Sequence, residues 1–459
     1  MSAIIPLLAA TLEQAYLVAH GIPSYSTEEG PQAHAQGWVD VEANGAIHVI
    51  YSGCKYRMGP APDSLGPEET FSTDQNVWEA RMSVGYDGTP HVVYQIGIAS
   101  GAKTSWYTTK KDDNWITPEK IVDADEINVR RAFHCDVAVD SAGNVLVCHW
   151  VVGSTDTENA FYRWRSKDGV WGDLKIVPQS NHEGAPKVRE LNGKFYLMYY
   201  NMEVNPCIAG PAEVGEDFTG GTCANALAIS TFLHEGHNFA LSADGRIAAT
   251  GGVRMEYPGP AGIWTAISND MQSFDSAQYM GDFPNSVRFT ENNIHPNLTF
   301  DDATGAVVVV GMNSGDSNAY YYVHENNAWN ASLQRIYSEG DEMQTCFRTG
   351  PSVADIPGRG VIILFRNGND LYLRKLMTER EITTVSPIKN TNKNSLNQLQ
   401  MIENGVLSIP SSGSYNVTIR DLNGKVLVKH NRAESKRLSL LKNNIPNGLY
   451  IVNLKRVKE

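Results

Sequence analysis

Residues 134–150, HCDVAVDSAGNVLVCHW, carry the pattern that decides the fold of this chain. Apolar and polar residues alternate up to a short turn that contains Gly143, and a mostly apolar run follows the turn. Alternation with a period of two is typical of strands, and a glycine-containing turn between two such runs indicates a hairpin. The stretch therefore predicts two antiparallel strands joined by a tight turn.

The same hairpin recurs along the first 378 residues, with turn glycines 43 to 60 residues apart. These glycines are Gly45, Gly88, Gly143, Gly193, Gly245, Gly305 and Gly358. Several units continue into a second hairpin, as at residues 160–177, so each unit supplies four strands. Seven four-stranded units of about 50 residues predict an all-β fold, a seven-bladed β-propeller.

The seventh unit contains only three predicted strands, the last at residues 371–377. We therefore expect residues 15–21, AYLVAHG, to supply the fourth strand and close the ring. Residues 1–14 are then an N-terminal extension or a signal-peptide remnant, because SAIIPLLAATL is a short apolar run without a basic segment before it.

The chain has 459 residues and a formal charge of −13, which is unevenly distributed. Residues 1–378 hold 25 Lys and Arg against 45 Asp and Glu, a net of −20, whereas residues 379–459 hold 13 against 6, a net of +7. We therefore expect a propeller at 15–377, a linker at 378–395 and a small Ig-like β-sandwich at 396–459. The acidic balance argues against a nucleic-acid partner. The sequence contains no run of about 20 apolar residues, so we expect no membrane span.

The even number of cysteines, six, favours a secreted protein with disulfides. Cys207 and Cys223 flank a Gly- and Pro-rich insertion, as a loop-closing disulfide would. Cys54 ends a strand of the first blade and Cys346 begins the seventh blade. A disulfide between these neighbouring blades is therefore a second expectation.

Cys135 and Cys148 are expected to face each other across one hairpin. Two buried thiols, a disulfide, or a structural Zn²⁺ site with His182 or another histidine remain open for this pair. A structural Ca²⁺ ion in the propeller is also compatible with the sequence, although no D-x-D-x-D run points to one.

The ligand face of a propeller is built from the starts of its innermost strands and the ends of the strands beside them. Aligning the hairpins on their turns places His134 opposite His149, and gives His237 and His295 the place of His134 in later blades. One histidine in such a place is most often a polar residue that caps a strand, whereas three favour a functional site. Tyrosine and arginine residues are expected on the same rim, namely Arg81, Tyr94, Tyr200, Arg254, Tyr257, Arg348 and Arg366.

Histidine, tyrosine and arginine together suit proton abstraction next to a carboxylate. An arginine neutralises a uronate and acidifies its C5 proton, a His or Tyr removes that proton, and another protonates the leaving oxygen. A glycosidase normally needs two Asp or Glu across the scissile bond, and the predicted rim offers no clear pair. This rim therefore favours β-elimination, which needs no cofactor.

The C-terminal region resembles the sorting domain of type IX-secreted Bacteroidetes proteins. The resemblance rests on Gly413, Tyr415, Asp421, Gly424 and Lys425, followed by Gly448-Leu-Tyr-Ile-Val. It implies a secreted or cell-surface protein whose C-terminal domain meets the secretion machinery. A generic Ig-like accessory domain is the alternative.

The propeller resembles the polysaccharide lyases of this architecture, notably ulvan lyases, and also the BNR-repeat group and the propeller rhamnosidases. The resemblance covers residues 36–377 and rests on the histidine-bearing inner strand, the D-S-x-G-N hairpin and the Arg/Tyr rim. It implies an enzyme, a polysaccharide lyase acting on rhamnose-glucuronate polymers. Carried over by position, the catalytic residues are His134, His149, Tyr200 and Arg254.

The other rim residues are then expected to bind substrate, namely Arg81, Tyr94, His237, Tyr257, His295, Arg348 and Arg366. A propeller glycoside hydrolase and a noncatalytic carbohydrate-binding propeller are the alternatives. The expected partner is an anionic polysaccharide, and the expected oligomeric state is a monomer.

Overall fold

The computed structural model describes most of the chain. The described residues are 10–22, 37–74, 77–97, 103–153, 158–180, 185–201, 206–223, 232–254, 261–271, 273–275, 278–280, 296–313, 318–325, 328–329, 334–336, 350–378, 395–402, 406–408, 415–420, 426–433, 437–439 and 448–456. The chain divides into two compact units, Met1–Arg380 and Glu381–Glu459.

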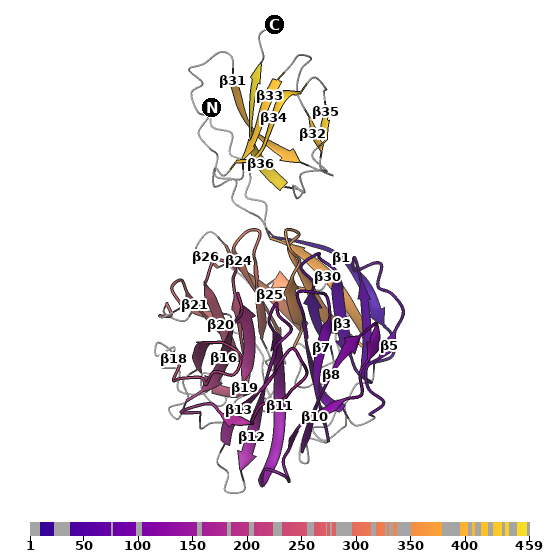
Figure 1. Ribbon diagram of the computed structural model, residues 1–459, viewed down its shortest axis with the longest axis vertical. Coiled ribbons are helices and arrows are strands. Elements are labelled where there is room, and N and C mark those ends of the chain that lie inside the picture. Colours follow the sequence, from indigo (N-terminus) through magenta and orange to yellow (C-terminus); the bar gives the residue numbers. More distant parts are fainter. Residues whose placement is uncertain are drawn as a thin grey trace. The chain divides into compact units, whose positions relative to one another are not determined.

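The first unit is built from seven antiparallel sheets that follow one another along the chain (Figure 1). Blade one contains β2 (Trp38–Val41), β3 (Ile47–Tyr51), β4 (Lys55–Gly59) and β5 (Glu69–Thr70). Blade two contains β6 (Val77–Val84), β7 (Pro90–Ile96), β8 (Thr104–Lys111), β9 (Asn114–Trp115) and β10 (Glu119–Asp123). Blade three contains β11 (Val129–Val139), β12 (Val145–Gly153), β13 (Glu158–Arg165) and β14 (Lys175–Ile176).

The next three blades repeat this order. Blade four contains β15 (Lys187–Leu191), β16 (Lys194–Tyr200), β17 (Pro206–Ala212) and β18 (Thr222–Cys223). Blade five contains β19 (Phe232–Leu241), β20 (Ile247–Arg254), β21 (Ala261–Ser268) and β22 (Gln278–Met280). Blade six contains β23 (Asn297–Asp301), β24 (Ala306–Asn313), β25 (Asn318–Glu325), β26 (Ala328–Trp329) and β27 (Gln334–Arg335).

The seventh blade joins the two ends of the propeller. It contains β28 (Ser352–Asp355), β29 (Val361–Asn367) and β30 (Asp370–Met377), and β1 (Thr11–Ala19) pairs with β30 as its fourth strand (Figure 1). The predicted closure by an N-terminal strand is confirmed. The strand begins at Thr11 and not at residue 15, because its pairing with β30 extends back to Thr11, which faces Met377.

The turn at residues 140–144 of blade three shows why these hairpins form. The carboxylate of Asp140 accepts the backbone N–H groups of Ala142 and Asn144 at 2.9 and 2.8 Å. Gly143 adopts a φ of +85°, a conformation that side-chain-bearing residues rarely take. Both features depend only on residues within the turn itself, so the turn can be recognised from the sequence.

The core lies between blades, because successive residues of one strand point toward different neighbours. Val307 and Val309 of β24 belong to a buried cluster with Ala248 of blade five. Val308 and Val310 belong to another cluster with residues of blade seven. Such strands are therefore apolar on both faces, as the continuous VVVV run at residues 307–310 indicates.

Side chains of the inner strands also bind backbone groups of the next blade. Asp40 Oδ2 accepts Val84 N–H at 2.7 Å. Ser352 Oγ accepts Val39 N–H at 3.2 Å, which connects blade seven to blade one. These contacts fix neighbouring inner strands around the central axis.

The second unit is also all-β. It has a four-stranded sheet, β31 (Ser395–Ile402), β36 (Gly448–Arg456), β33 (Tyr415–Arg420) and β34 (Val426–Ala433), and a two-stranded sheet, β32 (Val406–Ser408) and β35 (Arg437–Ser439). The predicted fold class, a seven-bladed propeller followed by a small β-sandwich, is confirmed. Throughout the described residues, no helix is long and apolar enough to cross a membrane.

Candidate functional site

His134 lies in a β-bulge at the centre of the propeller. In the pairing of β11 with β12, Phe133 faces Trp150 and Asp136 faces Cys148, with a register shift between them. His134 and Cys135 of β11 therefore together lie opposite the single residue His149 of β12. The predicted register, with His134 facing His149 and Cys135 facing Cys148, is wrong because it does not include this extra residue.

Three contacts hold His134 in the bulge. Its backbone N–H donates to Gln95 Oε1 at 3.0 Å, and its Nδ1 lies 3.0 Å from Glu79 Oε2. Its ring stacks on Trp150, with centroids 5.4 Å apart and an interplanar angle of 10°. These contacts stabilise a φ of +54°, which is unfavourable for a residue with a Cβ.

Glu79 is a functional candidate that the sequence argument missed. Its side chain is 1% exposed, and it accepts a hydrogen bond from Arg81 Nη2 at 2.6 Å as well as contacting His134. Burial favours the neutral acid, but Arg81 and then His134 outweigh it and hold the pKa of Glu79 well below its usual range. The carboxylate is therefore ionised, and His134 presents an Nδ1–H to it.

His149 is fully buried and lies in a different environment. Its Nδ1 is 3.2 Å from Ser105 Oγ. Burial lowers the pKa of His149 to about 3, with a smaller effect of Arg163 in the same direction. His149 is consequently a neutral imidazole near pH 7 and cannot serve there as a proton-donating imidazolium.

Tyr200 and His237 meet at the boundary of blades four and five. Their rings make an edge-to-face contact with centroids 4.5 Å apart, and each residue is 2% exposed. Burial raises the pKa of Tyr200, so the phenol keeps its proton. The structure thus brings Tyr200 into contact with His237, which was predicted to bind substrate.

Arg81 and Tyr94, two further predicted rim residues, contact side chains of the first two blades. Arg81 covers the ring of Trp38 at 4.8 Å in addition to its ion pair. Tyr94 is buried, and its hydroxyl contacts Ser72 Oγ and Asp74 Oδ2, each at 3.0 Å. In the pairing of β6 with β7, Tyr94 faces Ala80 and Arg81 faces Val93.

Arg366 lies on β29 of blade seven, where the propeller closes. Its guanidinium donates to the carbonyls of Gly368 and Ile22 at 2.6 and 2.8 Å. Only the backbone of Arg254 is described, at the end of β20, and Tyr257, His295 and Arg348 lie outside the described residues. Their roles stay predictions.

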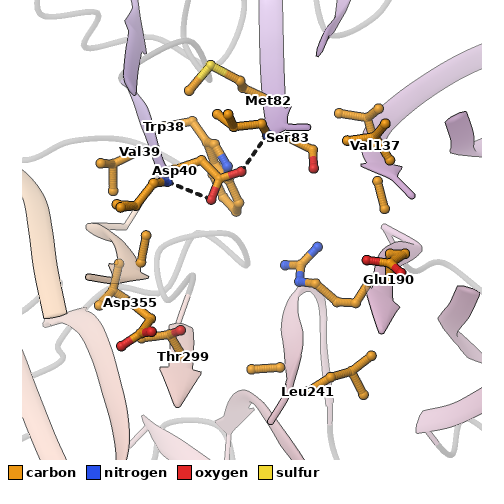
Figure 2. Close-up of a pocket in the computed structure, with 18 of the residues that line it drawn as sticks. Trp38, Val39, Asp40, Met82, Ser83, Val137, Glu190, Leu241, Thr299 and Asp355 are labelled. Carbon is orange, nitrogen blue, oxygen red and sulfur yellow. Dashed lines mark hydrogen bonds between the residues drawn. The ribbon is translucent and has the colours of Figure 1, made fainter. Parts of the chain in front are cut away.

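A cavity of about 330 Å³ occupies the opposite end of the inner strands, next to the hairpin turns (Figure 2). Inner strands of all seven blades line it, and Asp40, Glu190 and Asp355 face it from different blades. Burial raises the pKa of Asp40 to about 6. Burial and the neighbouring carboxylates of Asp301 and Asp302 raise the pKa of Asp355 to about 8.

The described cysteines separate into two groups. Cys54, Cys135 and Cys148 are free and buried. The expected disulfide between Cys54 and Cys346 therefore does not form, and Cys135 and Cys148 are two thiols. Cys207 is disulfide-bonded, and it faces Cys223 in the pairing of β17 with β18. Across the described residues, no group of three or more His, Cys, Asp and Glu could hold a metal ion, and His182 lies outside them.

No protein-family model matches the chain, and no curated protein matches it. Similar solved structures include a Hadza microbial sialidase, with 11% identity over 72% of this chain and 73% of that chain and a TM-score of 0.44. A Dyadobacter fermentans protein of unknown function has 11% identity over 81% and 100%, with a TM-score of 0.45. The Penicillium chrysogenum α-L-arabinanase has 9% identity over 80% and 98%, with a TM-score of 0.42. Similarity at this level leaves the activity to be argued from the residues of this chain.

Proposed function

We propose that this chain is a secreted polysaccharide lyase that cleaves a uronic-acid-containing polymer by β-elimination. The observation that carries the proposal is the buried Glu79–His134 pair, with Arg81 on the same carboxylate. A carboxylate that fixes a histidine tautomer is a common way to prepare a general base. Rhamnose-glucuronate polymers of the ulvan type are the substrate class that the sequence resemblance suggests.

In the proposed reaction His134 is the base. Because Nδ1–H points to Glu79, Nε2 holds the lone pair that removes the C5 proton of the uronate. A neighbouring cation stabilises the negative charge that grows on the carboxylate. The C5–H electron pair forms the C4=C5 double bond, and the C4–O4 bond breaks.

The leaving oxygen needs a proton, and Tyr200 is the proposed donor. Its raised pKa keeps the phenol protonated at neutral pH, as an acid requires. His149 is a less suitable acid because its imidazole is neutral. Water then returns a proton to Tyr200 and accepts one from His134, so the net products are an unsaturated uronyl end and a free hydroxyl.

The test is the ultraviolet absorbance of the full chain incubated with ulvan and with other uronic-acid polymers. A rise from the C4=C5 double bond supports the lyase, and Glu79→Gln should remove it. Reducing ends without that absorbance would overturn the lyase in favour of a hydrolase.

A glycoside hydrolase is the second candidate, and the cavity in Figure 2 favours it. Hydrolysis needs one carboxyl group that keeps its proton near neutral pH and a second that is ionised. Asp355 and Asp40, whose pKa values are about 8 and about 6, fit these two states near pH 7. Asp355→Asn should abolish hydrolysis but leave β-elimination unchanged, which separates the two sites.

Export through the C-terminal domain is part of the same proposal. The sorting-domain resemblance at residues 413–452 supports a secreted or cell-surface location. No cofactor enters the proposed chemistry, and a Ca²⁺ or Zn²⁺ ion would have a structural role. Deleting residues 396–459 should leave activity intact and retain the protein inside the cell that makes it.

A further inference from the structure

The cavity at the hairpin-turn end of the propeller has the size of a small-molecule pocket (Figure 2). Its volume of about 330 Å³ lies at the lower end of the range for such pockets, so it suits a single sugar-sized ring. Its lining contains none of Glu79, His134 and Tyr200, and it is therefore distinct from the site of the proposed elimination. The side chains of the cavity itself decide what it can bind.

A belt of hydrogen bonds fixes the wall of the cavity. Arg189 lines the cavity, and its guanidinium donates to Asp136 Oδ2 of blade three at 2.7 Å and to Asn238 Oδ1 of blade five at 2.6 Å. Its Nε donates to the carbonyl of Phe239 at 3.1 Å. Asn238 in turn donates to Asn297 Oδ1 of blade six at 2.7 Å. The wall is thus cross-linked through four blades, and a surface that is ordered before the ligand arrives lowers the entropy cost of binding.

Two of the three carboxyl groups that line the cavity already have hydrogen-bond donors. Asp40 accepts the backbone N–H groups of Val41 and Val84 at 2.9 and 2.7 Å. Glu190 accepts the hydroxyl of Tyr86 at 3.0 Å. The protein itself therefore stabilises these two carboxylates, and neither of them needs a bound cation as a partner.

Asp355, the third carboxyl group, is different. Its Oδ1 is buried and has no hydrogen-bond partner in the described part of the chain. Burial, together with Asp301 and Asp302, raises the pKa of Asp355 to about 8, so the group keeps its proton near pH 7. A protonated carboxyl group both donates and accepts a hydrogen bond, as a sugar hydroxyl does. Ser83 and Thr299 add hydroxyl groups to the same lining, so the cavity offers uncharged donors and acceptors (Figure 2).

The mouth of the cavity carries an exposed aromatic ring. Tyr86 lies in the turn between β6 and β7, lines the cavity and is 57% exposed. Its hydroxyl donates to Glu190 of blade four, 104 positions away, so the ring is held in place although it is open to solvent. Among the exposed large hydrophobic residues in the described part of the chain, Tyr86 is the only aromatic one. An aromatic face at the mouth of a polar cavity packs well against the C–H groups of a sugar ring.

We propose that this cavity binds one uncharged sugar ring, with hydroxyls on Asp355 and Ser83 and its C–H face on Tyr86. An anionic sugar would be repelled by the carboxylates of Asp40 and Glu190, whereas a cationic one would find both of them already bound by donors. The inference goes beyond the proposed elimination, because no residue of the cavity takes part in that reaction. It does not require hydrolysis either, although the second candidate function would make this sugar its substrate.

Titration calorimetry of the full chain tests the class of ligand. The neutral probes are glucose, galactose, mannose and rhamnose, and the charged probes are glucuronate, galacturonate, glucosamine and galactosamine. We expect a neutral sugar to bind with a Kd of about 1 mM, and Tyr86→Ala to weaken this binding at least about 10-fold. Val170→Ala, in another exposed turn, is the control and should leave it unchanged. Failure of all four neutral sugars to bind, or Tyr86-dependent binding that is tighter for a charged sugar, would overturn the proposal.

Two variants of Asp355 test the role of its carboxyl group. Asp355→Asn keeps an uncharged donor and acceptor of the same size, so the affinity for the neutral sugar should change less than about 3-fold. Asp355→Val removes both groups and should weaken binding about 10- to 100-fold. A loss of that size in Asp355→Asn would point to an ammonium ligand on an ionised carboxylate, and unaltered binding in Asp355→Val would exclude the carboxyl group from the site. Either result contradicts the proposal.

Activity measurements on the same samples separate this inference from the two proposed reactions. Wild-type protein that binds a neutral sugar but releases no reducing ends would retain the cavity site and refute hydrolysis there. Wild-type protein that forms unsaturated product but binds no neutral sugar would retain the lyase and refute the cavity site.

Discussion

The Nδ1 atom of His134 lies 3.0 Å from Oε2 of Glu79, although the two residues come from different blades and are 55 positions apart. Both side chains are almost completely buried, with exposures of 3% and 1%. The pair spans the boundary between blades two and three at the inner strands. The contact keeps the proton of the neutral His134 imidazole on Nδ1, next to the carboxylate.

Replacing Glu79 with Gln should therefore impair the base more than the fold. A glutamine amide can donate to Nδ1, which moves the histidine proton to Nε2 and removes the lone pair from the reacting side. We expect kcat to fall by about 10²- to 10⁴-fold, measured as the rate of unsaturated product formation. The matched control is Glu42→Gln, because Glu42 makes a similar contact with His48 at 2.8 Å in blade one. Equal losses in both variants would show that the effect is structural.

Acid should destabilise the propeller through its buried neutral histidines. Burial lowers the pKa of His91 to about 4, and its Nδ1 lies 2.6 Å from Tyr107 Oη. Because the unfolded chain takes up this proton near pH 6.5 and the folded chain only near pH 4, stability falls as the pH drops between these values. His91 alone should cost about 2 kcal/mol of unfolding free energy between pH 8 and pH 5.

Urea unfolding of wild type and His91→Asn at the two pH values measures this term. The variant is expected to have lower stability at pH 8 but a smaller decrease on acidification. His20→Asn is the control, because the His20 side chain is 75% exposed. An identical pH dependence in wild type and His91→Asn would refute the assignment.

Asp355 should have the opposite effect. Its folded-state pKa of about 8 exceeds the usual value of 3.8, so the folded chain keeps a proton that the unfolded chain has released. Stability is therefore lost as the pH rises from about 4 to about 8. Asp355→Asn should raise the unfolding free energy at pH 7 by up to about 4 kcal/mol and change it little at pH 4.

Denaturant titrations at pH 4 and pH 7 measure the effect of Asp355→Asn. The control is Asp168→Asn, in an exposed turn of blade three, for which no such difference between the two pH values is expected. A loss of stability in Asp355→Asn at pH 7 would mean that the ionised carboxylate is stabilising, contrary to this account.

Closure of the ring by β1 should govern the stability of the propeller. Tyr16 pairs with Leu373, and the buried Val18 packs in a cluster shared by blades seven and one. Deleting residues 1–20 exposes the outer edge of β30 and should lower the melting temperature by at least about 5 °C and promote association. Deleting residues 1–9 should do neither, since β1 is retained. Calorimetry and size-exclusion chromatography measure the two effects.

The blade hairpins could be predicted because their signals are local. The alternation around Gly143 and the hydrogen bonds of Asp140 with Ala142 and Asn144 lie within a few residues of each other. The N-terminal strand was also predictable, because the seventh unit lacked its fourth strand. The start of that strand at Thr11 was not, since the apolar run at the N-terminus gives no boundary.

The candidate site was only partly predictable for the same reason. Aligning the hairpins on their turns brought attention to His134 and Arg81 on the inner strands. The bulge after Phe133 changes which residues face each other, and it has no clear sequence signal. The only sequence signal for Glu79 is an acidic residue two positions before Arg81 on one predicted strand.

The sequence by itself determined the number of blades, the hairpin turns and the closure of the ring, because strand alternation and turn chemistry act over a few residues. The tertiary structure decided which charges are buried together at the axis. Glu79 and His134 come from neighbouring blades, and their contact depends on how the inner strands pack side by side. Packing across blades also decided that Arg189 of blade four binds Asp136 of blade three, at 2.7 Å.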